Sequence, residues 1–148
     1  KSFQRVSIAL NSSNSSQLIN LLRSVKISIL TCHCGMLTKD IYKLLLRTAE
    51  SVDEILVCFS KELNNKIKIG RLAQEMLSSK CRKLWFNTLA SRISIEDVEK
   101  LIQFFHRIDK KVSLAVPTTA AQSTFCCGVY RVVIDQSFVK LQSVDHFL

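Results

Sequence analysis

The sequence predicts an α/β fold: a short right-handed solenoid of about five repeats, with a parallel sheet on the concave side and helices on the convex side. Short apolar runs alternate with segments of helical periodicity in the order β-α-β-α-β-α-β-α-β, which is typical of a parallel sheet. After a shorter first interval from Val6 to Ile27, the runs recur about every 28 residues, at Ile55, Leu84 and Val112. Stacked repeats need a constant interval and a doubly wound sheet does not, so the spacing favours the solenoid.

Each expected element has its own local signal. The strands are expected where apolar runs rich in β-branched or aromatic residues are bounded by polar ones, at residues 6–10, 27–30, 55–59, 84–86 and 112–116. Apolar stripes at helical spacing fall at residues 18–22, 41–49, 72–77 and 98–105. Thr38 and Ser94 precede the second and fourth stripes as N-caps, and Asp97 follows Ser94 at capping-box distance.

Composition excludes several classes of protein. The chain has 148 residues, of which 47% are hydrophobic, with only 3 Gly and 1 Pro, so it is neither collagen-like nor globally disordered. No apolar run approaches the roughly 20 residues that span a bilayer, and residues 1–16 lack a secretory signal, so we expect no membrane association. The chain begins at Lys1, and we expect it to be part of a longer protein.

The net charge of +9 makes nucleic acid, an anionic membrane surface or an acidic protein patch plausible partners on electrostatic grounds. The alternative is that the basic surplus only makes the protein soluble.

The cysteines and histidines do not predict a metal site, a catalytic site or a cofactor. Cys32, His33 and Cys34 lie together, but no second ligand pair at zinc spacing follows them. The three isolated glycines cannot form a phosphate-binding loop. Cys58 lies within an apolar run, and free thiols in such runs behave as small hydrophobes. We therefore expect a non-enzymatic protein with reduced thiols, located in the cytoplasm.

The repeats resemble leucine-rich repeats of the ribonuclease-inhibitor type. Residues 27–32 (ISILTC), 36–40 (MLTKD) and 44–45 (LL) are similar to the strand, the loop ending in Leu-Thr and the helix of that family. Cys32 falls at the family's Asn/Cys position, as Asn11 does in the first repeat. Residues 84–86 (LWF) and 93–97 (ISIED) resemble a further repeat, and the likeness covers residues 5–116.

The degenerate repeats are similar to those of NLR-type innate immune receptors. That resemblance implies a protein-protein recognition module at the ligand-sensing or autoregulatory end of a larger intracellular receptor. Residues 1–116 are then the repeat array, and residues 117–148 an irregular C-terminal cap of the same domain. Its partners would be a protein with an acidic patch and the other domains of the parent chain. Two alternatives remain: a small basic α/β nucleic-acid-binding domain and a doubly wound domain without an active site.

The candidate binding surface is the concave face of the sheet. Side chains alternate along a strand, so the neighbours of the inward-facing residues line the exposed face. We expect the inward pairs to be Val6/Ile8, Ile27/Ile29, Ile55/Val57, Leu84/Phe86 and Val112/Leu114. The residues that precede the inward pairs form a ladder that is basic at four of five positions, Glu54 being the exception, and Trp85 stands beside it. Aromatic and basic residues are enriched at binding hot spots. The expected protein-binding face comprises Arg5, Lys26, Lys83, Trp85 and Lys111. The alternative is that these lysines are only solvated residues flanking the strands.

Overall fold

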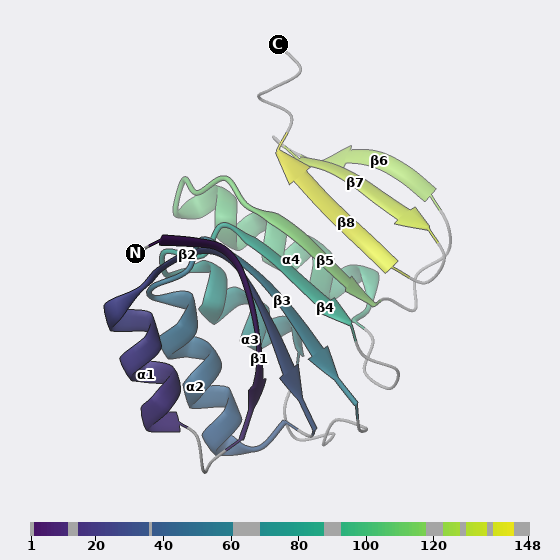
Figure 1. Cartoon of the computed structure of the whole chain (residues 1–148). Coiled ribbons are helices and arrows are strands. Elements are labelled where there is room, and N and C mark those ends of the chain that lie inside the picture. The colour runs from purple at the N-terminus through teal and green to yellow at the C-terminus, as the bar shows by residue number, and fades with distance from the viewer. Residues whose placement is uncertain are drawn as a thin grey trace.

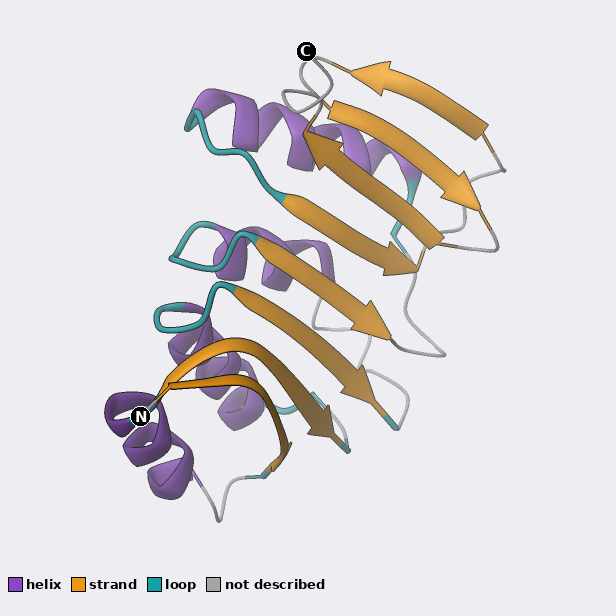
Figure 2. Ribbon diagram, turned by 45° about the horizontal axis from the view of Figure 1, so that its top comes forward, coloured by secondary structure: helices purple, strands orange, loops and turns teal. Residues whose placement is uncertain are grey.

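In the part of the chain that the structure describes, eight strands form one open sheet and four helices cover one of its faces (Figures 1 and 2). The structure is a computed structural model. It describes residues 2–11, 15–35, 37–60, 69–87, 93–117, 123–127, 130–135 and 138–143. The side chains of residues 2–4, 123, 125, 127, 135, 138 and 143 are outside that description.

The sheet has a parallel part and an antiparallel part. The parallel strands, in spatial order, are β1 (Ser2–Leu10), β2 (Lys26–Cys34), β3 (Glu54–Phe59), β4 (Lys83–Asn87) and β5 (Ser113–Pro117). The sheet continues beyond β5 with the antiparallel strands β8 (Phe138–Ser143), β7 (Tyr130–Asp135) and β6 (Ser123–Cys127). The helices are α1 (Ser15–Ser24), α2 (Lys39–Ala49), α3 (Ile69–Leu77) and α4 (Ile95–Arg107).

The parallel strands lie side by side in the order in which they occur in the chain. Helices α1 to α4 therefore form a single layer on one face, in which each helix contacts the next (Figure 2). A doubly wound sheet reverses its strand order and carries helices on both faces. The structure thus confirms the α/β class and the parallel strands, and its single helical layer differs from the doubly wound alternative. Among the described residues, no helix is both long enough and apolar enough to cross a bilayer.

The helix starts follow the predicted capping chemistry. The Thr38 side chain accepts a hydrogen bond from the Ile41 backbone N–H at 3.2 Å, and the Ser94 side chain accepts one from Asp97 at the same distance. Each cap satisfies an N–H that has no partner within its helix. At the other end of α4, Asp109 has a φ of 53°, the left-handed conformation that commonly terminates helices. Both predicted N-caps are confirmed.

The core lies between the sheet and the helices. A row of inward-facing residues crosses the parallel strands at the level of Val6, and its members Leu30, Ile55, Leu84 and Leu114 are at most 3% exposed. The units between these paired positions lengthen along the chain, and each is close in length to a leucine-rich repeat.

The expected near-constant interval is wrong. It counted Ile27 and Val112 as equivalent to Ile55 and Leu84, whereas strand pairing places Leu30 and Leu114 level with them.

The register of β2 accounts for much of the difference between the expected and the observed intervals along the chain. Its burial alternates regularly except between the buried residues Ile27 and Leu30, which are separated by an exposed Ser28 and a half-buried Ile29. Beyond this break, Leu30 and Cys32 pair with Ile55 and Val57. Cys32 therefore occupies a core position within β2, two residues before the strand ends. The first halves of β1 and β2 curve strongly at this point (Figure 2).

The C-terminal segment forms regular structure in its described parts. We expected an irregular C-terminal cap over residues 117–148. The strands β7 and β8 are present, and β6 joins them in an antiparallel extension of the same sheet. Strand β8 pairs with β5, so it covers the last edge of the parallel part. The alternation of Tyr130, Val132 and Ile134, each at most 2% exposed, fixes which face of β7 packs against the core.

Candidate functional site

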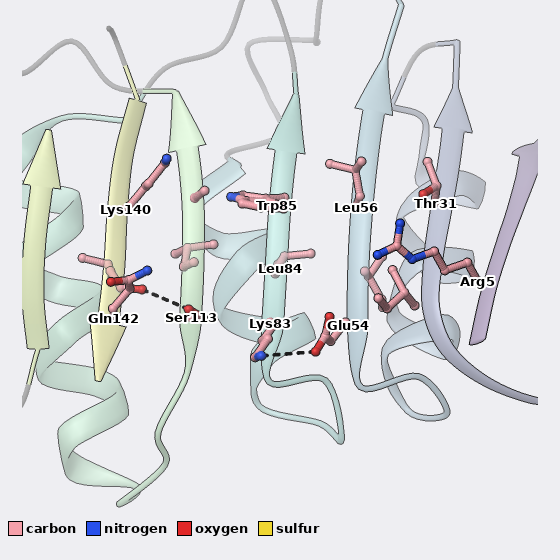
Figure 3. A pocket seen from close by; sticks show the side chains of 15 residues that line it. Arg5, Thr31, Glu54, Leu56, Lys83, Leu84, Trp85, Ser113, Lys140 and Gln142 are labelled. Atoms are coloured by element: carbon pink, nitrogen blue, oxygen red, sulfur yellow. Dashed lines mark hydrogen bonds and ion pairs between the residues drawn. The ribbon is translucent and has the colours of Figure 1, made fainter. Parts of the chain in front are cut away.

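The face of the sheet opposite the helices, called the open face below, contains a hollow of about 490 Å³. Its lining residues come from β1, β2, β3, β4, β5 and β8, so the hollow extends across the parallel part and onto the first antiparallel strand (Figure 3). Only strands meet there, because the helices all lie on the other side.

Strand pairing arranges the lining side chains in two rows that cross the sheet. The first row consists of Arg5, Ile29, Glu54, Lys83 and Ser113. The second row consists of Thr31, Leu56, Trp85, Ala115 and Lys140, and Ser7 continues it on β1 outside the hollow. Neighbouring members of a row are about one inter-strand distance apart, roughly 4.8 Å, so they can contact one ligand together.

The centre of the hollow is apolar. Trp85 is 55% exposed, the larger of the two values among the exposed large hydrophobic residues described. It lies between Leu56 and Ala115 in its row, and its indole extends over the hollow beside β5 (Figure 3). An exposed indole with aliphatic neighbours offers a partner a large apolar contact area that is already fixed in place.

The charges of the hollow are mostly basic. The Lys83 ammonium forms an ion pair with Glu54, with 3.2 Å between Nζ and Oε1. Arg5 and Lys140 are exposed and have no ion-pair partner among the residues that the structure describes. They flank the hollow on opposite sides, on β1 and β8, while the ion pair near its middle is neutral overall.

The structure brings together three of the five predicted site residues. Arg5, Lys83 and Trp85 line the hollow, with Arg5 and Lys83 in one row. Lys26 and Lys111 do not line it.

The two misplaced lysines are consequences of register. Lys26 lies three residues before Ile29 in β2 and pairs with Ser2. Ile29 pairs with Arg5 and Glu54 and therefore takes the place in the row that was expected for Lys26. Lys111 precedes β5, and Ser113 takes its place beside Lys83. The predicted ladder of four basic residues is therefore wrong, and only two of its members share a row.

Sequence reasoning missed Lys140. It pairs with Ala115 and lies between the buried residues Val139 and Leu141, so the apolar-polar-apolar alternation of β8 was the signal that could have found it. Because residues 117–148 were expected to form an irregular cap, Lys140 was not assigned to the predicted binding face.

The Cys32-His33-Cys34 segment divides between the two faces of β2. Cys32 and Cys34 are buried on the helix side, whereas His33 is exposed on the open face, with its Nε2 3.0 Å from the Ser7 hydroxyl. Burial raises the pKa of Cys34 to about 12 and raises that of Cys32 as well, so both thiols are protonated at neutral pH and are poor nucleophiles. Within the described ranges, no group of three or more metal-binding side chains is present.

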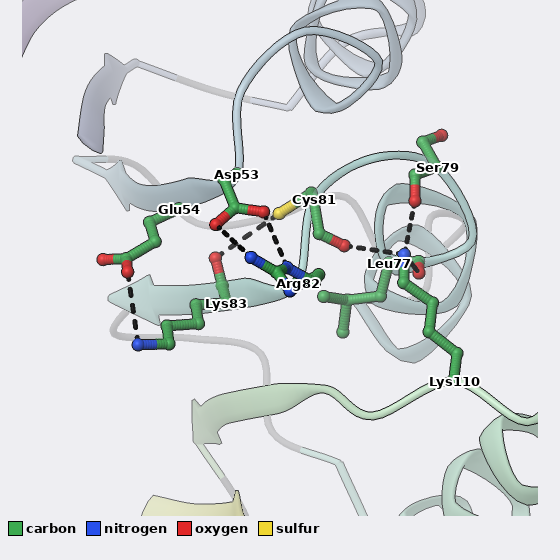
Figure 4. A network of polar contacts seen from close by, with 8 residues as sticks. All are labelled: Asp53, Glu54, Leu77, Ser79, Cys81, Arg82, Lys83 and Lys110. Carbon is green, nitrogen blue, oxygen red and sulfur yellow. Dashed lines mark hydrogen bonds and ion pairs between the residues drawn. The ribbon is translucent and has the colours of Figure 1, made fainter. Parts of the chain in front are cut away.

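An ion pair fixes the strand beginnings that carry Glu54 and Lys83 (Figure 4). The Arg82 guanidinium donates to both carboxylate oxygens of Asp53, at 2.9 and 3.1 Å. These hydrogen bonds lower the pKa of Asp53 below its usual value. The Arg82 backbone N–H also donates to the Asp53 carbonyl at 2.8 Å, and the Arg82 carbonyl accepts from Ser113. The entrances of three neighbouring strands are thereby linked.

A second polar contact joins α3, β4 and the antiparallel strands. The Lys110 ammonium donates to the carbonyl oxygens of Leu77, the last residue of α3, and of Ser79 and Cys81 beyond it (Figure 4). The Tyr130 hydroxyl of β7 in turn donates to the Lys110 carbonyl at 2.7 Å. Lys110 thus satisfies carbonyls that would otherwise lack a partner at the helix end.

The chain matches no protein-family model, and it is not significantly similar to any curated protein or to any solved structure.

Proposed function

We propose that the chain is a non-enzymatic protein-recognition module and that its open face is the binding surface. The observation on which this depends is the position of Trp85: an indole that is 55% exposed stands at the centre of a hollow lined by Arg5, Lys83 and Lys140. Aromatic anchors beside basic side chains are the composition of protein-binding hot spots.

We further propose that the five parallel strands belong to a short solenoid of degenerate leucine-rich repeats. Three features support this: strands that follow one another in chain order, helices on one face, and units between paired positions that are close to leucine-rich repeats in length. The sequence resemblance to NLR-type receptors then suggests the sensing or autoregulatory end of a larger cytoplasmic receptor.

Nucleic-acid binding is the second candidate, and the same indole favours it. An exposed aromatic side chain on a sheet flanked by basic residues can stack a base of a single strand. Glu54 argues against it, because its carboxylate lies in the hollow beside Lys83 and would repel a continuous phosphate backbone.

The test is a comparative capture experiment. The wild-type chain, Trp85→Ala and Ile108→Ala are immobilised and exposed to an extract of source cells, and bound proteins are quantified by mass spectrometry. Ile108 is the matched control, because it is the other exposed large hydrophobic residue described, at 44%, and follows α4 away from the hollow. We expect at least one protein that survives nuclease treatment, is lost with Trp85→Ala and is kept by Ile108→Ala.

If no protein shows that pattern, the proposal is wrong. If the Trp85-dependent binding disappears after nuclease treatment, the nucleic-acid alternative replaces it.

A further inference from the structure

We propose that the hollow binds an extended peptide segment with an acidic residue near each end and apolar side chains between them, running across the strands. This inference rests on the proposed function, because it specifies the partner of the same face.

The first argument is the arrangement of charge. The cations without an ion-pair partner among the described residues, Arg5 and Lys140, stand on β1 and β8 at opposite sides of the hollow. Between them, Glu54 neutralises Lys83. The hollow therefore favours two separated negative charges rather than a continuous run of them.

The second argument is the surface between those cations. Ile29, Leu56 and Trp85 line the hollow between its two basic sides and are only partly buried. A ligand charge placed over these side chains would lose water without gaining a partner, whereas apolar side chains would bury area against them. The middle of the ligand is therefore apolar.

The third argument is length. Strands β1 and β8 are five inter-strand steps apart, which is about 24 Å along the sheet. The Arg5 side chain extends towards the neighbouring strands, which shortens the distance that a ligand must cover (Figure 3). An extended peptide advances about 3.3 Å per residue, so the two acidic residues should be about five to seven positions apart.

A peptide is favoured over a nucleic acid because of this spacing. A nucleic acid carries a negative charge on every nucleotide, so phosphates would lie over both Glu54 and the apolar floor. The central strands of the hollow have neighbours on both sides, so the peptide cannot add to the sheet as another strand. Its side chains must supply the recognition.

The experiment uses the tryptophan fluorescence of the purified chain, because the sequence contains a single tryptophan, Trp85. Three synthetic peptides built from Glu, Leu, Phe and Ser are titrated: one with glutamates six positions apart, an isomer with them adjacent at the centre, and one with lysine replacing both glutamates of the first. We expect the spaced peptide to shift the emission to the blue and to bind about fivefold more tightly than its isomer. The lysine peptide should not bind measurably.

Variants then locate the two charges. Arg5→Glu and Lys140→Glu should each weaken the spaced peptide about fivefold, and the double variant should bind the lysine peptide instead. Lys26→Glu is the matched control, because it makes the same charge change at an exposed site outside the hollow, and it should alter affinity less than twofold. Circular dichroism confirms that each variant is folded.

Equal binding of the two isomers, or equal losses in Lys26→Glu and Lys140→Glu, would overturn the inference, since both indicate attraction by net charge alone. Preferential binding of an oligothymidylate would overturn it in favour of nucleic acid. If the two peptide isomers bind equally, Trp85-dependent protein capture can still persist. Failure of this inference is therefore distinguishable from failure of the proposed function.

Discussion

Adjacent residues of β4 should differ sharply in their contribution to stability. Phe86 is 1% exposed and packs against Phe59, with ring centroids 6.3 Å apart and rings inclined by only 13°. Phe86→Ala removes this packing and leaves a cavity, which costs about 3–5 kcal/mol. The Trp85 indole is more than half exposed and leaves no enclosed cavity, so Trp85→Ala should cost about 1 kcal/mol.

Thermal and urea unfolding, followed by far-ultraviolet circular dichroism, measure the two costs without depending on tryptophan emission. At about 3 °C per kcal/mol for a chain of this size, Phe86→Ala should lower the Tm by about 9–15 °C and Trp85→Ala by about 3 °C. Two variants of equal stability, or a larger loss for Trp85→Ala, would show that the register of β4 is wrong. The open face would then not present Trp85, and the proposed function would lose its central observation.

Three further predictions concern the polar contacts and the thiols. Lys110→Met should lower the free energy of unfolding in urea by about 1–3 kcal/mol, because the carbonyls it contacts lose a charged donor. Because Arg82 lowers the pKa of Asp53 in the folded protein, the ion pair stabilises the fold at pH values above about 4, the pKa of an Asp in the unfolded chain. This contribution is lost as the pH falls through the folded-state pKa of Asp53. The free energy of unfolding in urea should therefore fall less between pH 7 and pH 3 in Asp53→Asn than in the wild type. The exposed Cys126 should react with a disulfide reagent much faster than the buried thiols Cys32, Cys34 and Cys81, and burial raises the pKa of the last two to about 12. Equal reaction rates at these four thiols in the native protein would contradict that burial.

The sequence predicted the elements whose signals are local. The caps Thr38 and Ser94 act within one helical turn, so two short motifs specified them. In β3 and β4 the alternation of buried and exposed residues is regular, and their inward pairs were predicted correctly.

The remaining features depend on contacts between distant segments. The burial alternation of β2 is interrupted between Ile27 and Leu30, and only the pairing with β3 shows that Leu30, not Ile27, is level with Ile55. The alternation of β8 indicates that Lys140 is exposed, but its place beside Ala115 depends on β8 returning antiparallel to β5, which no local pattern specifies. The predicted placement of the candidate residues was therefore correct where it depended on the regular alternation of β4 and wrong where it required the register of β2 and β5.

The single helical layer has a mechanical consequence for the hollow. Neighbouring strands are about 4.8 Å apart, whereas packed helices need about 8–10 Å between their axes. A sheet with helices on one side only must bend away from them, so the curvature of the open face is set by the bulk of the opposite layer. The Tyr42 hydroxyl of α2 donates to Glu75 of α3 at 2.6 Å and ties two of these helices together. Larger side chains between those helices would increase the curvature and narrow the hollow without touching any residue that lines it.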